Sequence, residues 1–200
     1  MSKQEWKPGN MLYPLPAVMV TVCDRIGEEK KDNIITVAWV GTICTNPPMV
    51  SISLRKSRYS YEMLCHSREF VINLTTEKLA WATDFCGVRS GRDLDKFEAT
   101  GLTKEEASVV GAPLIKESPV NIECQVTEIK ELGSHVMFLA QVAAVHADEK
   151  YMDENKKFDL QKANPLVYSH GEYFSLGKSL GAFGYSVKKK KPRKHKGKYK

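Results

Sequence analysis

Apolar and polar residues alternate over most of the chain, a pattern typical of half-buried β-strands. The clearest case is residues 49–56, where Val50, Ile52 and Leu54 share one face while serines separate them on the other. Comparable segments are rich in Val and Ile and end at turn residues such as Asn46-Pro47-Pro48. The strands predicted in this way span residues 16–24, 34–44, 49–56, 69–74, 120–132 and 135–148.

Two segments follow a helical period instead. Residues 57–67 predict a helix with Ser57 or Ser60 as its N-cap, and residues 75–87 predict a second helix. Residues 120–132 and 135–148 flank Gly133-Ser134 and form the clearest β-hairpin signal in the chain. Residues 24–33, 88–102 and 164–187 are expected to be connections, the last with short turns or strands.

Strands that outnumber helices, with no repeated βαβ pattern, predict a mainly β fold. We expect an antiparallel, Greek-key-like β-barrel with a few short helices. Its 200 residues suit one domain over residues 1–187, because no Pro- or Ser-rich linker interrupts them.

The net charge of +6 depends on the C-terminal end. Residues 188–200 hold nine of the 30 Lys and Arg residues and no acid, which leaves 21 basic and 24 acidic residues in the body. Such a segment is expected to be a disordered basic tail. It is either passive or a contact for nucleic acid or another polyanion.

The N-terminus lacks the apolar core of a secretory signal, and no apolar run is long enough to span a membrane. A cytoplasmic protein with no membrane contact is therefore expected. Five cysteines without a C-x-x-C pair and five scattered histidines make a metal site unexpected. The cysteines are expected to be buried thiols, with Cys86 the one candidate for redox activity.

Polar, basic and aromatic residues gather directly after the strand at 49–56. Ser53, Arg55, Lys56, Ser57 and Ser60 lie where this strand ends and a helix begins. Cationic side chains, hydroxyls and free backbone N–H groups together are what binds a phosphate monoester. A capped helix beside a solvated basic turn explains the same residues.

The strand at 34–44 offers a surface for a flat ring. Alternation places Thr36, Ala38 and Val40 on one face, and small residues there leave room that Trp39 could border. Ordinary barrel packing is the alternative. The chain carries neither G-x-G-x-x-G after a strand nor a Walker loop, so a Rossmann or P-loop nucleotide site is not expected.

Four motifs in series carry a resemblance to a known family. They are N-x-x-T-x-A-W (33–39), NPPMVSISLRKSRYSYEML (46–64), EFVINL (69–74) and DFCGVRSGRDLDKF (84–97). Together, and over residues 14–187, they resemble the flavin reductase-like, FMN-binding split-barrel family, most closely its flavoredoxin-type branch. The resemblance implies a homodimeric split barrel that binds FMN non-covalently near the subunit interface.

The resemblance also implies roles for individual residues. The flavin phosphate would contact Arg55, Ser57 and Ser60, with Lys56 and Ser53 nearby. The ring would lie along Thr36, Val37, Ala38 and Trp39, and the loop with Ser90, Gly91, Arg92 and Lys96 would cover it or meet the partner subunit. His170 falls where related reductases approach the nicotinamide, whereas Asn73 is expected to be structural.

The expected function is that of an FMN-binding oxidoreductase, passing electrons from NAD(P)H or a redox protein through FMN to an acceptor. Because the flavin itself accepts a hydride, no acid–base pair is required. The alternative function is a binding module that uses the Lys-rich tail to contact nucleic acid or another polyanion.

Overall fold

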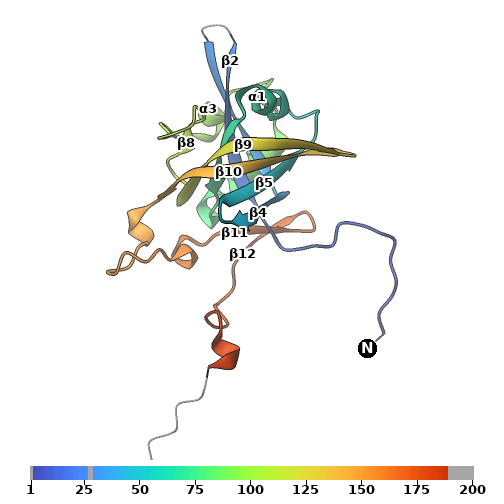
Figure 1. The fold of residues 1–200 in the computed structure, drawn as a ribbon, viewed down its shortest axis with the longest axis vertical. Coiled ribbons are helices and arrows are strands. Elements are labelled where there is room, and N and C mark those ends of the chain that lie inside the picture. The colour runs from blue at the N-terminus through green and yellow to red at the C-terminus, as the bar shows by residue number, and fades with distance from the viewer. Residues whose placement is uncertain (1, 27–28, 189–200) are drawn as a thin grey trace, which may run out of the picture.

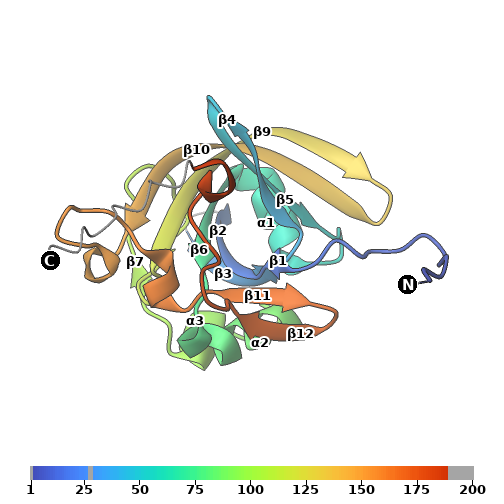
Figure 2. The same ribbon diagram turned by 90° about the horizontal axis from the view of Figure 1, so that it is seen from below.

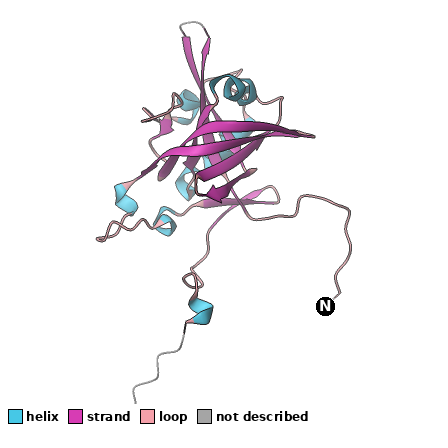
Figure 3. Ribbon diagram, viewed as in Figure 1, coloured by secondary structure: helices cyan, strands magenta, loops and turns pink. Residues whose placement is uncertain are grey.

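The alternating segments form one antiparallel sheet of seven strands, in the order β3-β2-β6-β9-β10-β5-β4 (Figures 1 and 3). The computed structural model describes residues 2–26 and 29–188. The strands are β2 (Val18–Ile26), β3 (Glu29–Val37), β4 (Val40–Thr45), β5 (Pro48–Leu54), β6 (Glu69–Leu74), β9 (Val120–Leu132) and β10 (His135–Ala147). β5 pairs with β10 although β6 and β9 come between them in the chain, which gives the Greek-key-like order. The sheet curves but does not close, since β3 and β4 remain edges, so the predicted mainly β split barrel is confirmed.

Smaller elements surround the sheet. The helices are α1 (Tyr59–Ser67), α2 (Ala80–Val88) and α3 (Lys96–Thr100), and the 3₁₀ turns are η1 (Glu77–Leu79), η2 (Glu149–Tyr151), η3 (Leu160–Ala163) and η4 (Tyr185–Val187). The remaining strands are β1 (Leu15–Pro16), β7 (Lys104–Glu105), β8 (Leu114–Ile115), β11 (Leu166–Ser169) and β12 (Glu172–Ser175). β1, β11 and β12 form a separate sheet, which Figure 2 shows beside α2. No described helix is long and apolar enough to cross a membrane.

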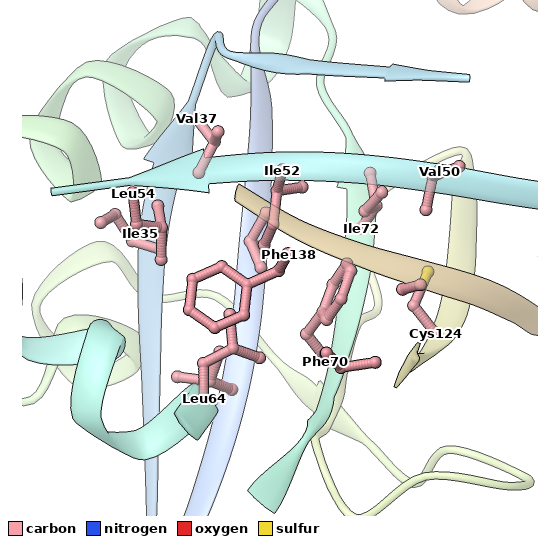
Figure 4. Packing of buried hydrophobic residues seen from close by; sticks show 14 of the residues in the cluster. Ile35, Val37, Val50, Ile52, Leu54, Leu64, Phe70, Ile72, Cys124 and Phe138 are labelled. Atoms are coloured by element: carbon pink, nitrogen blue, oxygen red, sulfur yellow. The ribbon is translucent and has the colours of Figure 1, made fainter. Parts of the chain in front are cut away.

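Three apolar clusters hold the described elements together, and the third contains Cys23, Val71, Val110, Ala112 and Leu114. The main core fills the barrel, where Phe70 and Phe138 pack against Ile52 and Leu64 (Figure 4). A second cluster lies between the sheet and helices α2 and α3, and includes Met19, Ile34 and Phe97. Because successive residues of β3 point to opposite faces, Ile34 serves the second cluster while Ile35 and Val37 serve the barrel.

A buried asparagine on β6 joins this strand to β2, β8 and β9. The Asn73 side chain is fully buried; its Nδ2 donates to the Met19 carbonyl at 3.0 Å, and its Oδ1 accepts from the Ile115 N–H at 3.0 Å and from Asn121 Nδ2 at 2.7 Å. Every polar atom of this amide is therefore used within the fold, which agrees with the structural role expected for Asn73.

A buried carboxylate fixes the loop between β7 and β8. Glu123 on β9 is fully buried and accepts hydrogen bonds from the backbone N–H groups of Ser108, Val109 and Val110. His146 on β10 contacts the same carboxylate. The negative charge is therefore matched by donors on every side, as burial of an ion requires.

The sequence expectations were wrong in four places. Residues 24–26 and 29–33 belong to paired strands and not to a connection, because β2 extends to Ile26 and β3 begins at Glu29. The strand expected at 34–44 is interrupted by a bend at residues 38–39. The expected loop 88–102 contains α3, whose N-cap Asp95 accepts from the N–H groups of Phe97 and Glu98. Neither Ser57 nor Ser60 caps α1, since its N-cap is Arg58, with no capping side-chain bond. The expected disordered tail lies, apart from Lys188, outside the described residues.

Candidate functional site

A large open cavity lies where the barrel is split. It has a volume of about 820 Å³ and is bordered by the β3–β4 bend, the end of β5, helix α2, the start of β10 and the β11–β12 hairpin. The lining residues that carry most of its chemistry are Thr36, Val37, Ala38, Trp39, Ser53, Arg55, Ser57, Arg58, Asp84, Ser134, His135, Tyr168 and Tyr173. The volume is within the range of roughly 300–1,000 Å³ that small-molecule sites have.

The bend between β3 and β4 forms one wall of this cavity. The Thr36 hydroxyl donates to the carbonyl of Thr83 at 2.5 Å, so it joins β3 to α2. The Trp39 indole stacks on the His135 imidazole, with ring centroids 5.8 Å apart and an interplanar angle of 11°. This wall therefore presents backbone, small side chains and the border of an aromatic stack.

A cationic corner lies beside this stack. Arg55 follows β5 and is exposed in the cavity; its guanidinium group has no hydrogen bond or ion pair among the described residues. Burial and the nearby positive charge of Arg55 lower the pKa of His135 below its usual value of 6.5. Near neutral pH, His135 is therefore a neutral ring beside a fixed positive charge.

The opposite wall carries a tyrosine and a carboxylate. Burial, followed by the charge of Asp84 and its hydrogen bond, raises the pKa of Tyr173 to about 12. The Tyr173 hydroxyl consequently stays protonated and donates toward Asp84. Tyr168 packs edge-on against Tyr173 with centroids 5.8 Å apart, so two aromatic rings border the cavity on this side.

A smaller pocket of about 200 Å³ continues from the cavity past Ser57, Arg58 and Gly87, which line both. Four cationic side chains line it, and none of its described lining residues is Asp or Glu. These cations are Arg58, Arg89, Arg92 and Lys96, and the hydroxyl-bearing residues beside them are Ser57, Tyr59, Ser60 and Ser90. Positive charge without a carboxylate partner is suited to an anion.

Close packing holds the loop over this small pocket. A Cβ added at Gly91 would overlap the Asn33 side-chain amide and would lie 2.9 Å from the Tyr59 ring. The Asn33 Nδ2 donates to Ser60 Oγ at 2.8 Å, and Arg92 lies over the Tyr59 ring and donates to the Ser57 carbonyl. Glycine at position 91 therefore lets Ser90 and Arg92 approach the pocket.

A buried lysine closes the inner end of the pocket. Lys96 is 4 % exposed, and its Nζ donates to the carbonyl oxygens of Ile34 at 2.7 Å and Cys86 at 2.8 Å. Burial lowers the pKa of Lys96 to about 8, and the charge of Arg58 acts in the same direction.

Cys86 is fully buried, and burial raises the pKa of its thiol to about 11. The thiolate, which is the reactive form of cysteine, is therefore disfavoured at this position. The structure supports packing over redox activity for this residue.

The structure brings most of the sequence-predicted site residues together. Thr36, Val37, Ala38, Trp39, Ser53, Arg55 and Ser57 line the large cavity, and Ser57, Ser60, Ser90, Gly91, Arg92 and Lys96 line the small pocket. Two predicted residues line neither. Lys56 is paired with Glu131 at 2.7 Å, and His170 lies in the β11–β12 turn with its ring 4.3 Å from that of Tyr13.

Several lining residues were not predicted from the sequence. They are Arg58, Asp84, Arg89, Ser134, His135, Tyr168 and Tyr173. Arg58 and Arg89 stand within or beside the motifs, so the cluster of basic residues was an available signal. Asp84, His135 and Tyr173 come from three distant elements, and no local pattern joins them.

Known proteins share both the sequence and the fold. The family model described as "Flavin reductase like domain" matches residues 11–177. The flavoredoxin of Desulfovibrio vulgaris (Miyazaki F) superposes with a TM-score of 0.86 at 28% identity, covering 94% of this chain and 100% of that one. The flavoredoxin from Methanosarcina acetivorans superposes with a TM-score of 0.83 at 27% identity and the same coverage.

Among sequence relatives, the NADH-dependent FMN reductase AsuE2 of Streptomyces nodosus subsp. asukaensis is 25% identical over 178 residues, which is 87% of this chain and 85% of that protein. The family model spans most of the chain, and the flavoredoxin structures superpose on 94% of it. The chain therefore belongs to the flavin reductase-like family, as its four motifs predicted.

Proposed function

We propose that this protein binds FMN and transfers electrons from NADH or NADPH to an acceptor. The observation that carries this proposal is the union of two cavities: an open one lined by aromatic rings and small residues, and a smaller one lined by four cations. FMN is divided in the same way, because a short chain joins its flat ring to its phosphate. The family and the names of its members, a flavoredoxin and an FMN reductase among them, support FMN in particular.

The residues present fit FMN. The ring would lie along Thr36 to Trp39, and the phosphate would enter the small pocket between Ser57, Arg58 and Arg92. Charge-assisted hydrogen bonds to a phosphate contribute roughly 1.5–3 kcal/mol each. Gly91 supports this placement, because any side chain there would push the loop away from the pocket.

Bound FMN supplies hydride and single-electron chemistry, so the protein has to hold and orient the reactants. Tyr168, Tyr173 and the Trp39–His135 stack border the open part of the cavity, where a second flat ring would stack. Arg55 lines this part of the cavity, outside the small pocket, and would face the phosphates of a nicotinamide donor. Asp84 and Tyr173 together offer a hydrogen-bond acceptor and donor on the opposite wall.

The test is a titration of the purified protein with FMN, followed by anaerobic addition of NADH or NADPH. We expect FMN to bind and its visible absorption to bleach with at least one donor. A protein that takes up no FMN would contradict the proposal.

An electron carrier fed by another protein is the second candidate. It is supported by the flavoredoxin structures, which match 94% of this chain. In that case bound FMN would remain oxidised with either nicotinamide donor and would bleach with a reduced redox protein. The same titration therefore separates the two candidates.

We also propose that the protein is a homodimer. Large apolar side chains are exposed on the N-terminal segment and beside the cavity, among them Trp6, Leu12, Trp39 and Ile43. A second copy would remove this apolar surface from water. Sedimentation equilibrium should give twice the chain mass of 22.5 kDa, and a monomer at micromolar concentration would contradict this proposal.

A further inference from the structure

The buried lysine of the small pocket joins two of its walls. The carbonyl acceptors of Lys96 belong to β3 and α2, and its own backbone begins α3. Two of the three Nζ donors are thus committed to the protein. Lys96 also lines the pocket, and its third donor has no acceptor among the described residues, so this donor is available to a ligand.

The charges that face Lys96 are all positive or neutral. Arg58 precedes α1 and lowers the pKa of Lys96 by repulsion; Arg89 and Arg92 line the same pocket. Cys86 on α2 would oppose this effect as a thiolate, but its own pKa of about 11 keeps it neutral. From β3 the neighbours are the Ile34 carbonyl and the uncharged Asn33. Four cations with no carboxylate among them repel one another. Lys96 is the one that can relieve this repulsion by losing its proton, because the arginines stay charged near neutral pH.

We propose that binding of a phosphate monoester in the small pocket is coupled to uptake of a proton by Lys96. This inference rests on the proposed function, in which FMN is that monoester. A phosphate dianion among the four cations stabilises the ammonium form, so the lysine that is partly neutral in the free protein becomes fully charged in the complex. The protein would then bind FMN more weakly as the pH rises above 8.

The direction of this pH dependence follows from the linkage between proton binding and FMN binding. A group whose pKa rises on binding takes up a proton, and affinity falls as the pH increases between the free and the bound pKa. The free value is about 8. A phosphate monoester has its second pKa near 6, so above pH 7.5 its own protonation contributes little.

Calorimetric titration of the wild-type protein with FMN at pH 8.5, in two buffers with different heats of ionisation, measures the proton directly. We expect uptake of more than half a proton per FMN bound, and a dissociation constant that rises about tenfold between pH 7.5 and pH 9. Riboflavin, which lacks the phosphate, should bind without this uptake.

Variants test whether Lys96 is the group that takes up the proton. Lys96→Arg keeps the charge at every pH, so its FMN affinity should not change between pH 7.5 and pH 9. Lys96→Met should also lose the proton uptake and should bind FMN more weakly at pH 7.5. Lys104→Met is the matched control, because this nearby lysine is exposed, pairs with Asp32 and lines neither cavity; it should retain the uptake.

The outcomes separate this inference from the proposed function. FMN binding without proton uptake by the wild-type protein would overturn the role of Lys96 and leave the function intact. Uptake that persists in Lys96→Met would do the same. Failure to bind FMN at any pH would overturn the proposed function itself.

Discussion

Oε1 of Glu123 lies 2.5 Å from Nε2 of His146, and the same carboxylate accepts three consecutive backbone N–H groups from residues 108–110. Burial alone would raise the pKa of Glu123, but the hydrogen bonds from Ser108, His146 and Val110 outweigh it and lower the pKa to about 2. This pair joins β9 and β10 to the β7–β8 loop. It lies outside the residues that line the two cavities, so its role is in the stability of the fold.

Replacing this carboxylate should destabilise the protein strongly. Glu123→Gln removes the charge and places an NH₂ group among donors, and we expect a loss of about 3–5 kcal/mol in the free energy of unfolding. Urea unfolding followed by circular dichroism measures this loss. Glu128→Gln is the matched control on the same strand, where the side chain is exposed, and it should change stability by less than about 0.5 kcal/mol.

Glu123 also predicts how the stability of the fold changes at acid pH. The pKa of Glu123 is about 2 in the folded protein against an ordinary value of 4.5, so its contribution is complete above pH 4.5 and is lost as the pH falls toward 2. The stability difference between the wild-type protein and Glu123→Gln should therefore narrow over this range. A difference that is as large at pH 2.5 as at pH 7 would contradict the assignment.

The phosphate subsite can be tested with one pair of arginines. Arg92→Ala should weaken FMN binding about tenfold and leave riboflavin binding unchanged, because Arg92 lines the small pocket. Arg55→Ala should affect FMN and riboflavin equally, because Arg55 lines only the large cavity. The placement implied by the family resemblance, with Arg55 at the phosphate, predicts the opposite for Arg55, and fluorescence titration decides between them.

Gly91 is predicted to be intolerant of any side chain. Gly91→Ala would press against the Asn33 amide and the Tyr59 ring, and overpacking of this kind costs about 1–3 kcal/mol. We expect the loop to move and FMN affinity to fall by about fivefold or more. Gly41→Ala is the control, since a Cβ at Gly41 meets no atom within 4 Å, and its FMN affinity should equal that of the wild type.

The sequence predicted the strands best where one face is buried and the other is solvated. Residues 49–56 became β5 with Val50, Ile52 and Leu54 buried, as the alternation indicated. The charged segment 24–33 was misread because the β2–β3 hairpin extends beyond the body of the barrel (Figure 1), where the consecutive residues Glu29, Lys30 and Lys31 of β3 are all exposed. Apolar and polar residues alternate along a strand where one of its faces is buried. The sequence of a strand that has no buried face therefore resembles that of a loop.

Short-range signals located the small pocket but only part of the large cavity. The motifs at 46–64 and 84–97 contain most of the residues around the pocket, because two short stretches, residues 57–60 and 86–96, supply all of its lining except Asn33 and Ile35. The helix α3 was missed since it has only five residues and its Lys96 is buried, contrary to the usual exposure of lysine. His135 and Tyr173 line the large cavity from β10 and β12, two elements far apart in the chain, which no spacing in the sequence reveals.

The β11–β12 hairpin completes the large cavity but belongs to a separate sheet, in which β1, with only two residues, is its other strand. The residues that pack the barrel come from other elements, so Tyr168 and Tyr173 can vary without disturbing the main core. The reacting partner of such a protein could thus diversify in evolution through the half-buried and exposed positions of this hairpin, 167–169 and 172–175, while the barrel and its small pocket stay the same. A laboratory library confined to this hairpin would search acceptor size and polarity at little cost in folding.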